Sequence, residues 1–277
     1  MASTMGPQRN SKVARSLFGD FRLREDNLTV DEEVASFLSS IHYAGPDSNG
    51  SPNLPRSVGK LVVDQESSRL LNTPDAWLDD VCINAGASWL QRLLSDTALP
   101  SCDTSRRCAI FNTHDLLRAG PSTTDEYLWR HVSATQYWTK DVWVIPIHRP
   151  SPESHWVLCV AHPHSHRMFL FDSFGQRHSW TRNIEDVMKL LTRLVLVANR
   201  SGHPCRVITE GWIARPVCIK AMQTNGYDCG VWVLAAIAAT LRGFHVPGFP
   251  EGDISKIRSA SYKGILAQPI YTRVRHT

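Results

Sequence analysis

The sequence predicts an α+β fold in which a central, mostly antiparallel sheet is flanked by helices. Three short apolar runs, rich in branched and aromatic residues, follow one another between residues 142 and 172, and they are typical of consecutive strands. Apolar residues recur with helical period on both sides of these runs. The segment 231–239 is apolar on every face, which is typical of a helix buried at the centre of a core.

A helix is predicted from Ala76 to Leu94. Asp79 and Asp80 stand where a first helical turn favours acidic side chains. Gly86 costs helix stability, so its place in the middle of the helix indicates close packing there. The apolar positions that define one face are 83, 87, 90 and 94.

The other predicted elements follow in chain order. They are a strand at 108–111, a helix between 123 and 137, strands at 142–147, 155–161 and 167–172, a helix at 183–198, a strand at 205–209 and a short helix at 253–258. Pro146 lacks a backbone N–H, so we expect its strand to end there or to lie at an edge. Asn183 is the expected N-cap of its helix.

Residues 1–55 are predicted to form a partly disordered N-terminal extension, and residues 56–277 a single domain. The stretch 46–55 has the Pro, Ser, Asn and Gly content of an exposed linker. Before it, residues 34–41 have the pattern of a short helix.

Composition excludes several classes of protein. The chain has 277 residues, 42% of them hydrophobic, and a net charge of +4 with scattered basic residues, so we expect no binding to nucleic acid. Its seven cysteines are irregularly spaced and odd in number, which favours a reducing compartment over a disulfide framework. No apolar run has the length of a membrane span or the character of a secretory signal. We expect a monomeric intracellular protein of the nucleus or cytoplasm, without a membrane partner.

Cys229 stands where a turn rich in Asn, Gly and Asp meets the apolar segment. This position predicts a thiol at a helix N-terminus, where the helix dipole favours the thiolate. An isolated cysteine in such a place is more often a small buried hydrophobe. Asn225 and Gly226 are expected to turn the chain tightly enough to bring Gln223 and Cys229 onto one atom.

A cysteine nucleophile needs a base, a group that orients the base, and donors for an oxyanion. His155 begins one predicted strand and Asp172 ends the next. Adjacent antiparallel strands bring the start of one beside the end of the other, so the two side chains are expected to meet. Gln223 and the backbone N–H of Cys229 are the candidate oxyanion donors.

Four blocks of sequence carry a resemblance to a known family. They are Trp77-Leu-Asp-Asp, His155-Trp-Val-Leu, Phe171-Asp-Ser-Phe-Gly and Gln223-Thr-Asn-Gly-Tyr-Asp-Cys-Gly-Val-Trp. In this order they resemble the ubiquitin-like-protein-specific cysteine proteases, the SUMO-protease family. The resemblance covers about residues 74–265 and implies a papain-like fold, with an Ulp-type protease domain within residues 56–277.

The resemblance also implies roles for individual residues. His155, Asp172 and Cys229 correspond to the catalytic triad, and Gln223 to the oxyanion hole. Trp77 and Trp156 correspond to two tryptophans that roof a narrow tunnel, which admits only the paired glycines at the end of a ubiquitin-like modifier. Asp80 corresponds to an acid that holds a basic residue of the modifier. The implied partner is a SUMO-like modifier, free or conjugated, and no cofactor is needed.

Three alternatives remain open at this point. Some bacterial effector acetyltransferases share the order His, acidic residue, Gln, Cys, although an acetyl-donor site has no use for Trp77 and Trp156. A modifier-binding module without activity is the second. The third is zinc, which we do not expect, because neither Cys102, Cys108 and His114 nor the alternating histidines of 162–166 contain the paired Cys-x-x-Cys unit.

Overall fold

The computed structural model describes residues 14–16, 19–23, 54–96, 102–150, 154–175, 180–248 and 250–272. In the first two of these segments, strands β1 (Ala14–Ser16) and β2 (Gly19–Leu23) pair antiparallel. The predicted helix at 34–41 and the predicted linker up to residue 53 lie outside the described residues.

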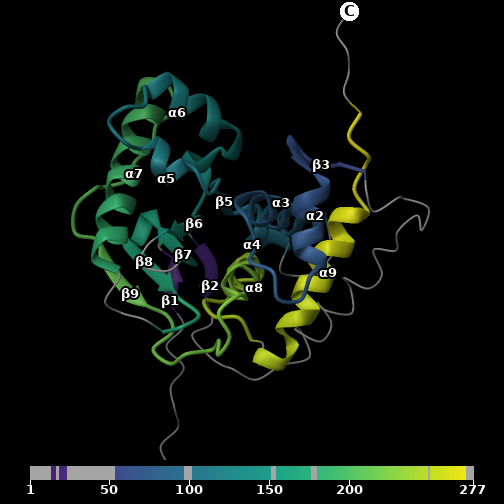
Figure 1. Cartoon of the computed structure of the whole chain (residues 1–277). Coiled ribbons are helices and arrows are strands. Elements are labelled where there is room, and N and C mark those ends of the chain that lie inside the picture. The colour runs from purple at the N-terminus through teal and green to yellow at the C-terminus, as the bar shows by residue number, and fades with distance from the viewer. Residues whose placement is uncertain are drawn as a thin grey trace, which may run out of the picture.

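A five-stranded mixed sheet forms the centre of the fold, in the order β5-β6-β7-β8-β9 (Figure 1). Its strands are β5 (Cys108–Ile110), β6 (Val142–Arg149), β7 (His155–His162), β8 (Arg167–Phe171) and β9 (Ile213–Pro216). The long central pairings β6–β7 and β7–β8 are antiparallel, whereas β5 and β9 add to the two edges in parallel. The predicted α+β class is confirmed. The sheet is mixed because each outer strand runs parallel to its neighbour.

Helices cover both faces of the sheet. They are α2 (Gln65–Asn72), α3 (Asp80–Asp96), α4 (Cys102–Arg106), α5 (Asp115–Arg118), α6 (Asp125–Val132), α7 (Trp180–Arg200), α8 (Cys229–Leu241) and α9 (Ile254–Leu266). Figure 1 shows α5, α6 and α7 gathered on one side, α2, α3 and α9 on the other, and α8 between the sheet and this second group. Every residue of α8 is buried, as its uniformly apolar sequence predicts.

Alternation along the strands divides the core into two halves. Residues of β6 and β7 on the α8 face are Val142, Val144, Leu158 and Val160, and those on the α7 face are Trp143, Ile145, Val157 and Cys159. Successive side chains of a strand point to opposite faces, so a strand buried on both faces is apolar throughout. This placement fixes the sheet between α7 and α8.

The first predicted helix begins at Asp80, four residues later than expected, because Asp79 caps it. The Asp79 carboxylate accepts a hydrogen bond of 2.7 Å from the backbone N–H of Cys82. A Cβ added at Gly86 would lie 2.8 Å from Leu234 of α8, which confirms the expected close packing.

Strand β6 does not end at Pro146 but runs on to Arg149. Because β5 pairs with β6 only as far as Val144, one side of β6 has no neighbouring strand at Pro146 in the described chain, which confirms the expected edge position. Two other predictions, in α7 and after it, are wrong. Helix α7 begins at Trp180, and Asn183 lies inside it instead of capping it. Residues 205–209 form no strand, and at the first of them the backbone N–H of Cys205 donates to the side chain of Asn199 at 3.0 Å.

Two helix lengths also differ from the predictions. The helix expected between 123 and 137 is divided, because α6 ends at Val132 and the left-handed backbone of Gln136 (φ 51°) interrupts the turns that follow. The last helix, α9, is longer than predicted and extends to Leu266.

Two short strands, β3 (Arg56–Val58) and β4 (Leu61–Val63), form a hairpin beside α3 and α9. The backbone of β3 joins the C-terminal segment, with Ser57 N–H donating to the carbonyl of Pro269 at 2.8 Å. None of the helices in the described segments combines the length and apolar character needed to cross a membrane.

Candidate active site

The structure places His155 at the start of β7 and Asp172 directly after the end of β8. The strands pair antiparallel, so the two side chains meet, and Nε2 of His155 lies 2.9 Å from Oδ1 of Asp172. Both residues are buried. The ring of Phe174 stacks on the imidazole with 4.9 Å between centroids, which holds the plane of the ring.

Asp172 is surrounded by groups that favour its charged form. Oδ2 accepts a hydrogen bond of 2.7 Å from Arg149, and Oδ1 accepts one of 3.0 Å from the backbone N–H of Phe174. Burial alone would raise the pKa of Asp172, but its interactions with His155, Phe174 and Arg149 hold the pKa below its usual range. The carboxylate is therefore charged and fixed in orientation.

Arg149 was not singled out from the sequence. It lies opposite His155 in the β6–β7 register, so its backbone position is set by the same strand pairing. Its Nε donates to Asn183 at 2.7 Å, and its guanidinium lies 4.3 Å from the centre of the Trp180 ring. Two residues of α7 therefore position Arg149, which in turn binds Asp172. One buried arginine among scattered basic residues leaves no signal in the sequence.

His155 has a second ring nitrogen, Nδ1, which is buried and has no standard hydrogen-bond partner within the described residues. Cys229 is the neighbour with which the His155 side chain interacts besides Asp172. Burial alone would lower the pKa of His155, but its interactions with Asp172 and Cys229 raise the pKa to about 9. The imidazolium form is therefore favoured near neutral pH.

Cys229 is the first residue of α8 and is buried. The N–H groups of a first helical turn have no partner within the helix, and their dipoles favour a negative charge at this position. The N-cap residue, Asp228, makes no side-chain capping bond, so it does not compete for these N–H groups.

Five other cysteines in the described chain are free and buried. Burial raises the pKa of Cys108, Cys159 and Cys218 to about 12, which keeps these thiols protonated and unreactive. No three His, Cys, Asp or Glu side chains gather as a metal-binding group in the part of the chain that the structure describes.

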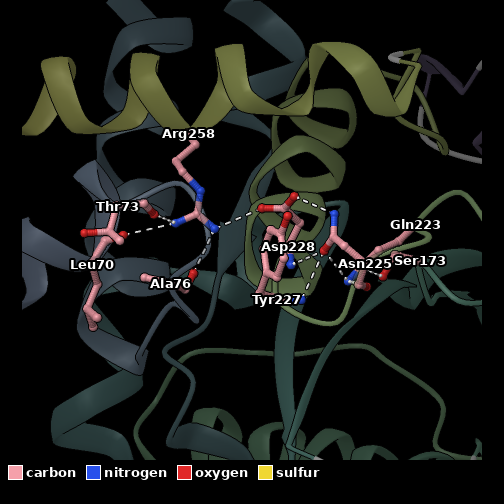
Figure 2. Close-up of polar contacts among 9 residues, drawn as sticks. All are labelled: Leu70, Thr73, Ala76, Ser173, Gln223, Asn225, Tyr227, Asp228 and Arg258. Atoms are coloured by element: carbon pink, nitrogen blue, oxygen red, sulfur yellow. Dashed lines mark hydrogen bonds and ion pairs between the residues drawn. The ribbon is translucent and has the colours of Figure 1, made fainter.

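Gln223 is buried beside the end of β8, and its amide is fixed at both ends (Figure 2). Ser173, the residue after Asp172, donates from its hydroxyl to Oε1 of Gln223 at 2.7 Å. Nε2 donates to the backbone carbonyl of Asn225 at 2.7 Å. Nε2 also makes a longer contact of 3.4 Å with Oδ1 of Asn225, so both oxygens of Asn225 face this amide nitrogen.

The turn before Cys229 is made by Asn225. Its side-chain oxygen accepts hydrogen bonds from the backbone N–H groups of Tyr227 at 3.1 Å and Asp228 at 3.0 Å. The chain turns through Asn225 and Gly226 as expected, but the turn does not require a glycine at 226, because its φ lies outside the left-handed region and an added Cβ would meet nothing within 4 Å.

Trp77 lies in the segment that precedes α3, and Trp156 lies in β7. The exposed fractions of the two side chains differ. Trp77 is 48% exposed, whereas Trp156 is 5% exposed and donates from Nε1 to the carbonyl of Leu78 at 2.8 Å. This bond ties the residue after His155 to the residue after Trp77. At the surface nearby, Asp80 lies 2.8 Å from Nε2 of His114.

Comparison with known families bears on this site. A model of the Ulp1 protease family, C-terminal catalytic domain, matches residues 83–270, more than half of the chain. This chain belongs to the Ulp1 protease family. It is therefore a cysteine peptidase of the class that acts on ubiquitin-like proteins. The matched residues include His155, Asp172, Gln223 and Cys229, whereas Trp77 and Asp80 precede them.

Solved structures of Ulp1 proteases share the fold. The catalytic domain of a Chaetomium thermophilum Ulp1-like SUMO protease has a TM-score of 0.59 at 20% identity, covering 92% of this chain and 98% of that one. The C-terminal Ulp1 protease domain in complex with Smt3, the yeast orthologue of SUMO, has a TM-score of 0.57 at 17% identity, covering 86% and 96%. No curated protein sequence matches the chain significantly.

Proposed function

We propose that this Ulp1-family peptidase cleaves the bond after the C-terminal diglycine of a ubiquitin-like modifier, and that the modifier is SUMO-like. The bond is an isopeptide in a conjugate, a peptide in a precursor, or either. The observation that carries the proposal is the buried His155–Asp172 pair beside Cys229 at the N-terminus of α8. The solved complex of a fold relative with Smt3 supports the choice of modifier.

The proposed chemistry is nucleophilic acyl transfer. The sulfur of Cys229 attacks the carbonyl carbon of the terminal glycine, and the proton of the thiol is held by His155. His155 then protonates the leaving amine as the C–N bond breaks, and a thioester remains on Cys229. Water, deprotonated by His155, hydrolyses the thioester and releases the modifier with a free carboxylate. Asp172 keeps Nδ1 of His155 directed at the sulfur by bonding Nε2.

The oxyanion of the tetrahedral intermediate needs donors that are already in place. The proposed donors are the backbone N–H of Cys229 and the Gln223 amide, whose second N–H would exchange its long 3.4 Å contact with Asn225 Oδ1 for the oxyanion. Ser173 and Asn225 fix the Gln223 amide on either side, so the oxyanion does not have to reorient it.

Trp77 and Trp156 are proposed to form the channel for the diglycine. Flat rings can close over a backbone that has no side chains, whereas a Cβ on the substrate would clash. Trp156 is already fixed by its bond to Leu78, and the exposed Trp77 is free to close over the substrate. Asp80 is proposed to exchange His114 for a basic side chain of the modifier.

The test is a panel of electrophilic probes built on the C-terminal diglycine of SUMO, of a related small modifier and of ubiquitin, with the site of labelling located by mass spectrometry. We expect the SUMO probe to label Cys229 fastest. Labelling by the ubiquitin probe alone would contradict the SUMO preference. A folded protein that no probe labels would instead be a binding module, and acetylation of Cys229 by acetyl-coenzyme A without cleavage of any modifier would indicate acyl transfer.

A further inference from the structure

Arg258 of α9 is buried and makes four hydrogen bonds to segments far from it in sequence (Figure 2). Its Nη1 donates to the backbone carbonyls of Leu70 at 3.0 Å and Thr73 at 3.1 Å. Its Nη2 donates to the carbonyl of Ala76 at 2.9 Å and to Oδ1 of Asp228 at 2.9 Å. The side chain therefore joins the α2–α3 connection to the loop that precedes Cys229.

One arm of this network leads to the proposed oxyanion donor. Asp228 is adjacent to Cys229, and its second oxygen accepts a hydrogen bond of 2.9 Å from the Asn225 side chain. The backbone carbonyl of Asn225 accepts from Gln223. Arg258 thus acts on the loop from Gln223 to Cys229 through the Asp228 carboxylate.

The other arm leads to the proposed substrate channel. Ala76, whose carbonyl Arg258 binds, is followed directly by Trp77 and Leu78. The carbonyl of Leu78 accepts the bond from Trp156, and a Cβ at Gly230 would lie 2.9 Å from Leu78. The Trp77 segment and the start of α8 are therefore in close contact, and Arg258 holds both.

We propose that Arg258 is a positioning residue that fixes the Trp77 wall of the channel relative to the Cys229 sulfur, an inference that rests on the proposed function. The planar guanidinium carries five N–H donors in a fixed fork, which suits three carbonyls and one carboxylate. A lysine ammonium keeps the charge but has three donors on a flexible stem, so it cannot hold all four acceptors in the same geometry.

If Arg258 only supported the fold, its replacement would destabilise the protein without changing the alignment of the site. Arg193 of α7 is a matched control for this case. It donates to Asp125 at 3.0 Å and to the carbonyls of Arg118 at 3.2 Å and Gly120 at 2.8 Å, but its partners lie on the α5–α6 side, away from the Cys229 loop. Arg193→Lys therefore removes a similar set of bonds at a distance from the proposed site.

The experiment compares the full chain with its Arg258→Lys and Arg193→Lys variants at a temperature below every Tm. Two rates are measured at Cys229, labelling by the SUMO C-terminal electrophile and alkylation by iodoacetamide. Misplacing reacting groups by about 1 Å costs roughly 10²-fold, so we expect Arg258→Lys to slow SUMO-probe labelling by about that factor. Iodoacetamide alkylation should change little, because Arg258 does not contact the His155–Cys229 pair. Arg193→Lys should leave both rates near wild type.

A second variant guards against misfolding of Arg258→Lys. Asp228→Asn keeps the shape of the acceptor and removes its charge, and it should also slow SUMO-probe labelling. In the double variant the combined loss should be smaller than the product of the two single losses, because both changes act on the network that joins Arg258 to Asn225 through Asp228. Wild-type rates in either single variant would overturn the inference, as would equal slowing by Arg193→Lys. If the wild type is not labelled by any modifier probe, the proposed function fails and this inference fails with it.

Discussion

At the scale of single residues, the two nitrogens of His155 serve different neighbours. Nε2 is bound to Asp172, which Arg149 and Phe174 hold in place, and Nδ1 is left for Cys229. Interactions with Asp172 and Cys229 together raise the pKa of His155 to about 9 against the effect of burial. The charged imidazole is thus a property of the whole cluster.

The folded pKa of His155 exceeds the ordinary value of 6.5, so charged His155 stabilises the fold. This contribution is fully present below pH 6.5 and is lost as the pH rises through about 9. We expect the ring resonances of His155 to titrate near pH 9 in the wild type and at lower pH in Cys229→Ala, because the cysteine is one of the groups that raise the pKa. NMR titration of the histidine rings measures both values, and identical values in the two proteins would mean that Cys229 does not interact with His155.

At the scale of elements, the close approach of α8 to the Trp77–Leu78 segment depends on Gly230. An added Cβ would lie 2.9 Å from the Leu78 Cβ and 3.3 Å from Ile83. These neighbours are buried and packed, so they cannot move aside without shifting the start of α3. Close packing against Leu78 therefore explains why a glycine stands at position 230, and the sequence alone does not reveal this contact.

We expect Gly230→Ala to lower kcat/KM for modifier cleavage by roughly 10²-fold, because it displaces the channel wall from the nucleophile. Gly226→Ala is the control, since its Cβ would meet nothing within 4 Å and its φ is ordinary. It should keep near wild-type kcat/KM. Steady-state kinetics on both variants decide this point, and equal activity of the two would show that the α8 contact with Leu78 does not set the site.

At the scale of the whole molecule, the two ends of the protease domain are joined through β3. Ser57 N–H donates to Pro269 and Tyr271 N–H donates to the carbonyl of Pro55, each at 2.8 Å. Val58 and Val63 of the β3–β4 hairpin are fully buried in the core half that contains α8. The hairpin thus belongs to the folded unit, and we propose that residues 1–53 are dispensable for cleavage.

We expect residues 54–277 to keep the turnover of the full chain. A protein that starts at residue 64 lacks the hairpin, so the core surface against which Val58 and Val63 pack becomes exposed. Burial of each such side chain contributes about 1.5–3 kcal/mol to the free energy of unfolding. The combined loss is a large part of a typical free energy of unfolding. Urea unfolding and turnover of the two truncated proteins measure this, and a fully stable 64–277 protein would place the domain boundary after β4.

Local patterns predicted much of this molecule. The sheet follows from apolar runs, α8 from its uniform burial, and the meeting of His155 with Asp172 from strand pairing. Each of these features depends on residues close in sequence or on one rule of antiparallel geometry. The α+β class follows from the same patterns, whereas the family was indicated by the resemblance of four blocks of sequence.

Long-range contacts account for what the sequence did not reveal. Arg258 binds a carbonyl 188 residues away, and Arg149 binds Asp172 across 23 residues, yet neither stands out among the scattered basic residues. Tertiary partners decided these two cases, and no local propensity indicated them. The strand expected at 205–209 is a different case, because there the side chain of Asn199, only six residues away, accepts the backbone N–H of Cys205.

The central claim is that Cys229 is the nucleophile that cuts after the diglycine of a ubiquitin-like modifier. The most direct measurement is the intact mass of the products formed from a SUMO precursor extended beyond its diglycine. The wild type should release modifier that ends in Gly-Gly, and Cys229→Ala should release none while still binding the modifier. Cleavage by Cys229→Ala, or cleavage by the wild type at any other bond, would contradict the account.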